Sequence, residues 1–242
     1  MTNPADWAAN PGPPQQAVPA ATVILVRDRP GAGLEVLMVR RNASLAFAGG
    51  MWVFPGGRVD PDDRDPANPD DELAAGRRAG AREVAEEAGL VVEASSLVTF
   101  SHWTPPPGPS RRFSTWFFVA PAPTGAVTID GGEIHAHRWF APAEALQNHR
   151  RGEIDLIPPT WITLAMLCGF ADVAGLLEVA RGRQPEIFVT RLAVSAEGTV
   201  ALYEGDAGYA DGDADRPGDR HRLRMTADGW TYARPDGTLI AP

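Results

Sequence analysis

The stretch REVAEEAGL, residues 82–90, constrains the fold more than any other part of the chain. At about 100° per residue, Glu83, Glu86 and Glu87 fall on one face of a helix. The apolar positions of the same stretch fall on the opposite face, which is expected to pack on a sheet: Ala81, Val84, Ala85 and Ala88. The pattern predicts an amphipathic helix that begins within 70–73 and ends at Gly89, a residue suited to a left-handed cap.

Runs rich in β-branched and apolar residues lie on both sides of this helix and predict strands. They are ATVILVRD (21–28), LEVLMVRR (34–41), the aromatic GGMWVFPGG (49–57), LVVEASSLVTFSHW (90–103), RRFSTWFFVAPA (111–122) and EIHAHRWFAP (133–142). Helical periodicity returns over 142–152 and from 160 to about 181. This order of strands and helices predicts a mixed sheet covered by helices, which belongs to the α/β or α+β class.

The chain divides into three parts by composition. Residues 1–19 are rich in Pro, Ala, Asn and Gln and predict a flexible leader. Residues 20–184 form the main domain, with a Pro- and Asp-rich loop at 58–71 that is expected to be solvated. In residues 185–242, the runs EIFVTRLAV (186–194) and HRLRMTADGWTYARPDG (221–237) predict short strands on either side of a Gly- and Asp-rich loop at 204–219. This part is expected to be a small C-terminal β-rich extension.

Net charge, cysteine content and hydrophobicity limit the binding partners and the cellular location that the sequence predicts. The net charge of −9 and a pI of about 5.0 oppose binding to a nucleic acid polymer. Cys168 is the only cysteine, so an internal disulfide is excluded, a reducing cytoplasmic location is expected, and the side chain is expected to be buried in an apolar helix. The most apolar stretch, 161–170, is about half as long as a membrane span, so a core helix and no membrane partner are predicted.

Three carboxylates three and four residues apart repel one another unless a cation offsets their charge. Arg82, one turn before Glu86, allows a solvated face with a salt bridge. Alternatively the carboxylates form a hard-oxygen site for Mg²⁺ or Mn²⁺, ions that activate water and clamp phosphate oxygens. A di-iron site is disfavoured because the chain lacks paired Glu-x-x-His motifs.

Residues 82–90 match every specified position of R-E-U-x-E-E-x-G-U, the second half of the Nudix box, where U is apolar. The chain therefore resembles the Nudix hydrolase family over about residues 20–181, which implies an α/β/α sandwich. The first half of the Nudix box is not matched, because Asn68 and Ala74 occupy the positions of its glycine and its glutamate. The FPGG motif ends at Gly57, eleven residues early, which implies an insertion; Glu72 takes the missing place only if the frame shifts within the loop.

Three further segments are similar to the coenzyme A diphosphatase branch of the family, of the mammalian peroxisomal type: FAGGMWVFPGGRVDPDD, HWTPPPGPSRRFSTWFF and LIPPTWITL. This likeness implies hydrolysis of a phosphoanhydride in coenzyme A or an acyl-CoA. ADP-ribose, a dinucleotide and a nucleoside triphosphate remain alternative substrates. A Nudix-like domain that binds a nucleotide without turning it over is the alternative from another class.

The resemblance assigns roles to matching positions. Glu83, Glu86 and Glu87 would hold the metal, with the Gly57 carbonyl as a further ligand, and one of the three glutamates is an alternative acceptor for the proton of the water. Arg82 would fix the carboxylates through charge-assisted hydrogen bonds. Glu133, ahead of the strand at 134–140, is the expected general base, with an exposed turn acid as the alternative.

Arginines near strand ends suit phosphate groups of the substrate. Arg40, Arg41 and Arg112 are the expected substrate-binding residues, as is Arg111 beside the last, although each also suits a surface salt bridge. His135 and His137 are expected on the surface of the sheet. The extension is expected either to cover the pocket or to join two subunits as a homodimer.

Overall fold

The computed structural model describes residues 17–31, 33–45, 48–107, 112–196 and 198–241. Most of the predicted leader, and Arg111, lie outside them. Two compact units are present. The larger contains Pro19–His102 and Thr115–Glu186. The smaller contains the described parts of Met1–Val18, Trp103–Ser114 and Ile187–Pro242, so it includes a segment that the sequence analysis placed within 20–184.

A large mixed sheet runs in the order β3-β2-β1-β6-β5-β8, with β4 also paired to β1 and β7 to β2. Its strands are β1 (Val18–Arg29), β2 (Gly33–Arg41), β3 (Trp52–Val53), β4 (Gly56–Arg58), β5 (Val98–Thr104), β6 (Phe113–Pro121), β7 (Ile134–Phe140) and β8 (Glu186–Val189). The first two form an antiparallel hairpin with Val26 opposite Val36. The strands predicted at 21–28 and 34–41 are therefore confirmed.

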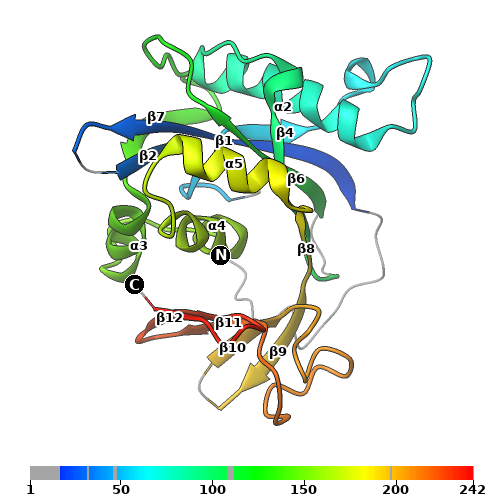
Figure 1. The fold of residues 1–242 in the computed structure, drawn as a ribbon, viewed down its shortest axis with the longest axis vertical. Helices are drawn as coiled ribbons and strands as arrows, with labels where there is room; N and C mark the ends of the chain where they lie inside the picture. The colour runs from blue at the N-terminus through cyan, green and yellow to red at the C-terminus, as the bar shows by residue number, and fades with distance from the viewer. Residues whose placement is uncertain (1–16, 32, 46–47, 108–111, 197, 242) are drawn as a thin grey trace. The chain divides into compact units, whose positions relative to one another are not determined.

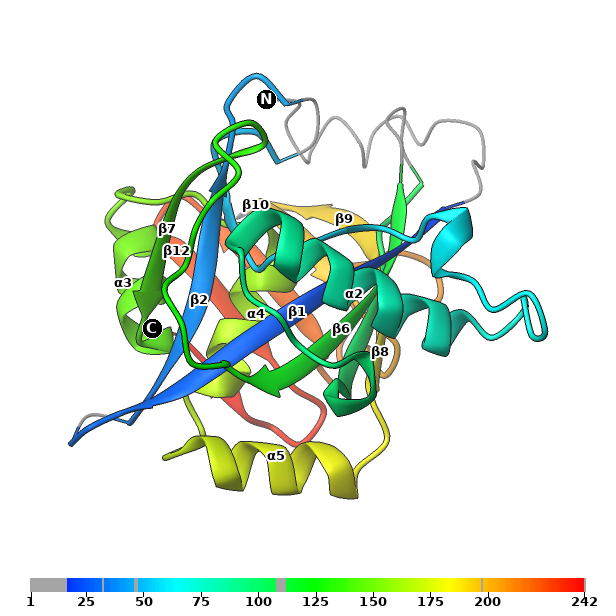
Figure 2. The same cartoon turned by 90° about the horizontal axis from the view of Figure 1, so that it is seen from above.

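Helices cover both faces of this sheet within the larger unit. Helix α2 (Glu72–Ala88) lies on one face, whereas α4 (Pro158–Leu167) and α5 (Val173–Gly182) lie on the other (Figure 1). Seen from above, α2 crosses β1 and β6 (Figure 2). The Asp71 side chain caps α2 by accepting a 2.9 Å bond from the Ala74 N–H, and Gly89 ends the helix at φ 65°. The predicted fold and helix limits are confirmed.

Small residues allow α2 to approach the sheet closely. A Cβ atom on Gly80 would lie only 2.8 Å from a Val23 methyl group. The residues that α2 buries are Ala75, Gly76, Ala79, Gly80, Val84, Glu87 and Ala88. Ala85 is exposed and Glu87 is buried, so the predicted division of faces is wrong at these two positions. The Gly and Ala residues of the first turns set the contact face, and this face continues to Glu87.

Three other predictions need correction. The segment 90–103 is a strand only from Val98, because Ala94–Ser96 form a 3₁₀ turn that the Ser96 hydroxyl closes on the Glu93 carbonyl. The helical region at 160–181 is two helices, since Asp172 caps the second at the Gly175 N–H. Cys168 is exposed because it follows the last residue of α4.

The helix predicted at 142–152 is confirmed as α3 (Pro142–Arg150). The stretch 161–170, predicted as a core helix, contributes most of α4, in which Trp161, Ile162, Leu164 and Leu167 are buried. None of the helices among the described residues has both the length and the apolar character that a bilayer crossing requires.

The smaller unit contains an antiparallel sheet in the order β13-β12-β11-β10-β9. Its strands are β9 (Arg191–Ser195), β10 (Gly198–Leu202), β11 (Arg222–Thr226), β12 (Gly229–Ala233) and β13 (Leu239–Ile240). The rings of Trp103 and Phe188 stack at 3.8 Å, and Tyr203 meets both edge-on. The predicted β character of the extension is confirmed, whereas β10 and β13 were not predicted.

A buried ion pair organises the Gly- and Asp-rich loop of this unit. Both carboxylate oxygens of Asp206 accept from Arg222, at 2.6 and 2.7 Å, and both side chains are almost inaccessible. Asp206 also accepts from the backbone N–H groups of Gly208 and His221, at 2.9 Å each. Because all these donors depend on one carboxylate, the pair determines the path of the loop.

Replacing Asp206 by Ala leaves a buried guanidinium without its anion. We expect the variant to lose about 3–5 kcal/mol of unfolding free energy, measured by urea denaturation. Asp211→Ala removes the exposed partner of Arg216 and is the control, with an expected loss below about 1 kcal/mol. Equal losses in the two variants would contradict an organising role for the buried pair.

Candidate active site

Two glycines bring the backbone against the carboxylates of α2. The Gly56 N–H donates to Glu87 Oε2 at 2.9 Å. A Cβ atom on Gly57 would lie 2.2 Å from Glu83 Oε1, so a side chain at this position would displace the Glu83 carboxylate. Pairing of β4 with β1, with Gly57 opposite Ala21, holds this turn in place. Gly57, predicted as a metal ligand, therefore lies next to Glu83.

Arg82 joins two glutamates to the inserted loop. Its Nη1 donates to Glu83 Oε1 at 2.8 Å and to Glu86 Oε2 at 3.1 Å, so the predicted pair one turn apart is present. Its Nη2 donates at 2.9 Å both to Asp63 Oδ2 and to the Arg58 carbonyl. The hydrogen bond to Asp63, with that to Glu83, raises the pKa of Arg82 above its usual value. The guanidinium stays charged and holds these groups together.

Asp63 is a site residue that the sequence analysis missed. Asp63 is only 5% exposed, although the loop at 58–71 was expected to be solvated. Besides Arg82, its carboxylate accepts a 2.9 Å bond from the Asp60 N–H, which closes the 3₁₀ turn Pro61–Asp63. Asp-Pro-x-Asp is a capping-box spacing with Pro at the first helical position, and this signal indicates an ordered turn.

Arg41 links Glu87 to the expected general base. Its Nη1 lies 3.6 Å from Glu87 Oε1, and its Nη2 lies 3.4 Å from Glu133 Oε2. Glu133 precedes β7, and its N–H donates to Asp130 at 2.9 Å. The Glu133 side chain is 62% exposed, whereas that of Glu87 is 7% exposed. The structure thus brings Arg41, Glu87 and Glu133 together.

Burial changes the acidity of two of the glutamates. Desolvation raises the pKa of Glu87 from 4.5 to about 8, against the opposing effects of the Gly56 N–H and Arg41. Burial likewise raises the pKa of Glu83, and Arg82 opposes the rise. The nearby charge of Glu133 adds to both shifts. An added cation would favour the ionised carboxylates, so the site is suited to one.

The donors fit a hard divalent cation in chemical type. Carboxylate and carbonyl oxygens are the ligands that Mg²⁺ prefers, and Glu83, Glu87 and the Gly57 backbone adjoin one another. Within the described ranges, no three His, Cys, Asp or Glu side chains converge as a ready-made metal site. Arg82 and Arg41 engage the carboxylates instead, so cation binding requires these contacts to rearrange.

The remaining predicted residues lie apart from the carboxylates or are engaged elsewhere. Arg40 is exposed and donates to the Gly50 carbonyl at 3.2 Å. Arg112 belongs to the smaller unit and donates to the Pro105 carbonyl at 2.6 Å. Glu72 begins α2 eleven residues before Glu83, or about 16 Å along the axis, so the two cannot share an ion. His135 and His137 are exposed on β7, as predicted.

Residues 17–159 match the model of the NUDIX domain family. Acyl-coenzyme A diphosphatase NUDT19 of Gallus gallus is 30% identical to the chain over 155 residues, which is 60% of this chain and 40% of that protein. The Xenopus laevis protein of the same name is 30% identical over 118 residues, or 47% and 31%. The chain thus matches less than half the length of these relatives.

The crystal structure of a NUDIX hydrolase from Alicyclobacillus acidocaldarius shares the fold, with a TM-score of 0.60 and 24% identity. The match covers 71% of this chain and 98% of that one. Because the family model covers more than half of the sequence, the chain belongs to the NUDIX domain family. The resemblance deduced from residues 82–90 is confirmed.

The raised pKa of Glu87 predicts a pH-dependent stability in the absence of metal. A neutral Glu87 stabilises the fold fully below pH 4.5, and this contribution is lost as the pH rises through about 8. In EDTA, Glu87→Gln should therefore gain about 2–4 kcal/mol relative to the wild type between pH 5.5 and 9. Denaturant unfolding at several pH values measures the difference. A stability difference that does not change with pH would contradict the assignment, and Glu178→Gln is the exposed control.

Proposed function

We propose that the protein is a Mg²⁺- or Mn²⁺-dependent hydrolase of a nucleoside diphosphate linked to another group, with coenzyme A or an acyl-CoA as the favoured substrate. The observation that carries this proposal is the contact of Glu83 and Glu87 with the Gly56–Gly57 turn. Nudix hydrolases in general use divalent metal ions, and this contact supplies hard oxygen donors for one. The named activity of the two relatives supports the choice of substrate.

Each residue of the site is proposed to have a separate role in hydrolysis. Glu83, Glu86 and Glu87 would hold the cation together with the Gly57 carbonyl, and the Glu86 side chain is 58% exposed. The bound cation supplies positive charge that polarises the phosphoanhydride. Arg82 orients the carboxylates from its anchor on Asp63. Glu133, exposed and next to Arg41, accepts the proton of the attacking water.

Arg41 is the best placed of the proposed substrate-binding arginines. Its side chain is 16% exposed, and its Nε is buried with no hydrogen-bond partner among the described residues. The Arg41 guanidinium, next to Glu87, would bind a phosphate oxygen of the substrate. Arg40 and Arg112 stay proposals for the same role.

Glu87→Gln tests the proposed chemistry. We expect turnover of the preferred substrate in saturating Mg²⁺ to fall by about 10²-fold or more, because a neutral amide cannot supply the charge that holds the cation. Glu178→Gln, on the exposed side of α5, should keep wild-type turnover. Wild-type turnover in the Glu87 variant would rule out this site.

Mass spectrometry of the products identifies the substrate. Incubation with coenzyme A, acetyl-CoA, ADP-ribose, a dinucleotide and a nucleoside triphosphate should yield an adenosine bisphosphate and a phosphopantetheine from the first two. Faster cleavage of any other member assigns the sister activity. Binding without any product supports the alternative of a nucleotide-binding domain without catalysis, which the presence of all three glutamates disfavours.

The remaining predictions concern partners and location. The acidic chain is proposed to act on a small nucleotide and not on a nucleic acid polymer or a membrane. A homodimer joined through residues 185–242 is proposed because Val194 and Leu239 expose 59% and 66% of their surface. Light scattering of the whole protein and of a variant lacking these residues tests it. Cytoplasmic localisation stays a prediction.

A further inference from the structure

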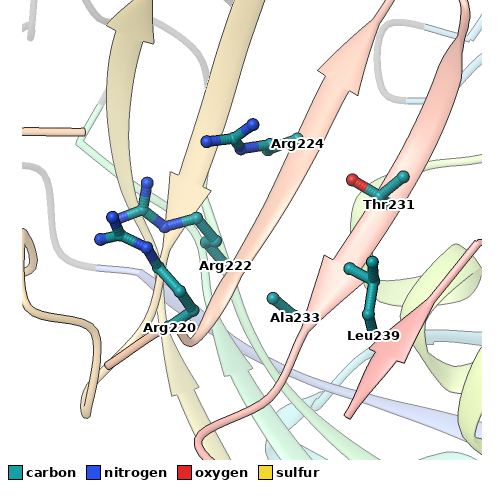
Figure 3. Close-up of a pocket in the computed structure, with 6 residues that line it drawn as sticks. All are labelled: Arg220, Arg222, Arg224, Thr231, Ala233 and Leu239. Atoms are coloured by element: carbon teal, nitrogen blue, oxygen red, sulfur yellow. The ribbon is translucent and has the colours of Figure 1, made fainter. Parts of the chain in front are cut away.

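A basic cavity lies on one face of the C-terminal sheet. Its volume is about 250 Å³, and it is lined by Arg220, Arg222, Arg224, Thr231, Ala233 and Leu239. Figure 3 shows the three guanidinium groups gathered on one side, with the other three side chains facing them. All six residues lie beyond residues 17–159, so the cavity is separate in sequence from the matched domain.

Strand geometry explains why these residues share a face. Arg222 and Arg224 stand two residues apart on β11, and side chains at this spacing point to the same side of a strand, while Arg220 precedes the strand. Arg222 lies opposite Ala233 and Arg224 opposite Thr231, while Ala233 is in turn opposite Leu239. Residues directly opposite on paired strands also share a face. The pairing of β11, β12 and β13 therefore places these side chains on one face of the sheet.

Arg222 forms a fixed base for the cavity. It is 1% exposed, with Nε and Nη2 donating to Asp206 and Nη1 donating to the Ala214 carbonyl at 2.5 Å. These bonds use three of its five N–H groups. The other two, one on each terminal nitrogen, have no acceptor among the described residues. Asp206 already balances the charge of Arg222, so Arg222 contributes hydrogen bonds to a ligand and no net charge.

Arg220 contributes the charge that Arg222 does not. Its Nη1 donates to the Arg216 carbonyl, and it makes no ion pair within the described part of the chain. Arg220 and Arg224 are both half-buried beside Arg222. A bound anion would therefore find the charge of the Arg220 guanidinium at this site. A basic cavity in a chain of net charge −9 is a local arrangement and not a property of the whole surface.

We propose that this cavity binds a phosphate group, either as inorganic phosphate or as a phosphate monoester. Guanidinium forks match phosphate oxygens in pairs, and the Thr231 hydroxyl adds a donor. At about 250 Å³ the cavity is smaller than the roughly 300–1,000 Å³ pockets of drug-sized ligands. It therefore suits a phosphate with a sugar-sized body. The apolar Leu239 and Ala233 face that body.

Calorimetric titration of the full chain with inorganic phosphate and with ribose 5-phosphate tests the proposal. EDTA is present throughout, so a metal-dependent site does not contribute. Arg220→Ala/Arg224→Ala should weaken binding by about tenfold or more. Thr231→Val, which keeps the shape of the side chain, should weaken it less. Arg29→Ala/Arg181→Ala removes the same charge from exposed positions and should bind as the wild type does.

The comparison of the two ligands identifies the source of the phosphate. Tighter binding of ribose 5-phosphate assigns a phosphorylated small molecule, and equal or tighter binding of inorganic phosphate assigns the free ion. The proposal is overturned if neither ligand binds, if the Arg220/Arg224 variant binds as the wild type does, or if the control pair weakens binding equally. Circular dichroism of each variant establishes that its fold is retained.

Discussion

The contact between the Gly56–Gly57 turn and the buried carboxylate of Glu87 is the constraint on which the rest of the site depends. Glu87 lies on the face that α2 packs against the sheet, so its charge has one backbone N–H and one arginine to offset desolvation. Glu83 lies one turn earlier, against Gly57. This placement leaves the carboxylates short of positive charge at neutral pH, which is the property that a divalent cation satisfies.

Hydrogen bonds from Arg82 of α2 hold the inserted loop before this helix against the site. Arg82 holds Glu83 and Glu86 with one terminal nitrogen and reaches Asp63 and the Arg58 carbonyl with the other. Asp63 in turn closes its own 3₁₀ turn through Asp60. One arginine therefore couples the order of the loop to the orientation of two proposed metal ligands.

Local signals in the sequence predicted the elements and the motif, whereas long-range packing was not visible in them. Periodicity gave the limits of α2 and the β1–β2 hairpin, and the spacing of the glutamates gave the family. The buried position of Glu87 depends on how Gly80 seats the helix on Val23 and Gly76 seats it on Phe118, which no pattern within residues 82–90 reports. Composition also failed to predict the burial of Asp63, because an Asp-rich loop is expected to be solvated. The capping-box spacing of Asp60 and Asp63 is the signal that indicates an ordered turn.

Titration of the metal-free protein with Mn²⁺, followed by electron paramagnetic resonance, measures cation binding at these carboxylates. Free Mn²⁺ gives a sharp signal that is lost on binding, so occupancy is measured without any substrate. We expect a saturable site in the wild type that Glu83→Gln and Glu87→Gln each weaken by about tenfold or more, with Glu178→Gln unchanged. A wild-type protein that binds no Mn²⁺, or variants that bind it as tightly as the wild type, would show that Glu83 and Glu87 do not form a cation site.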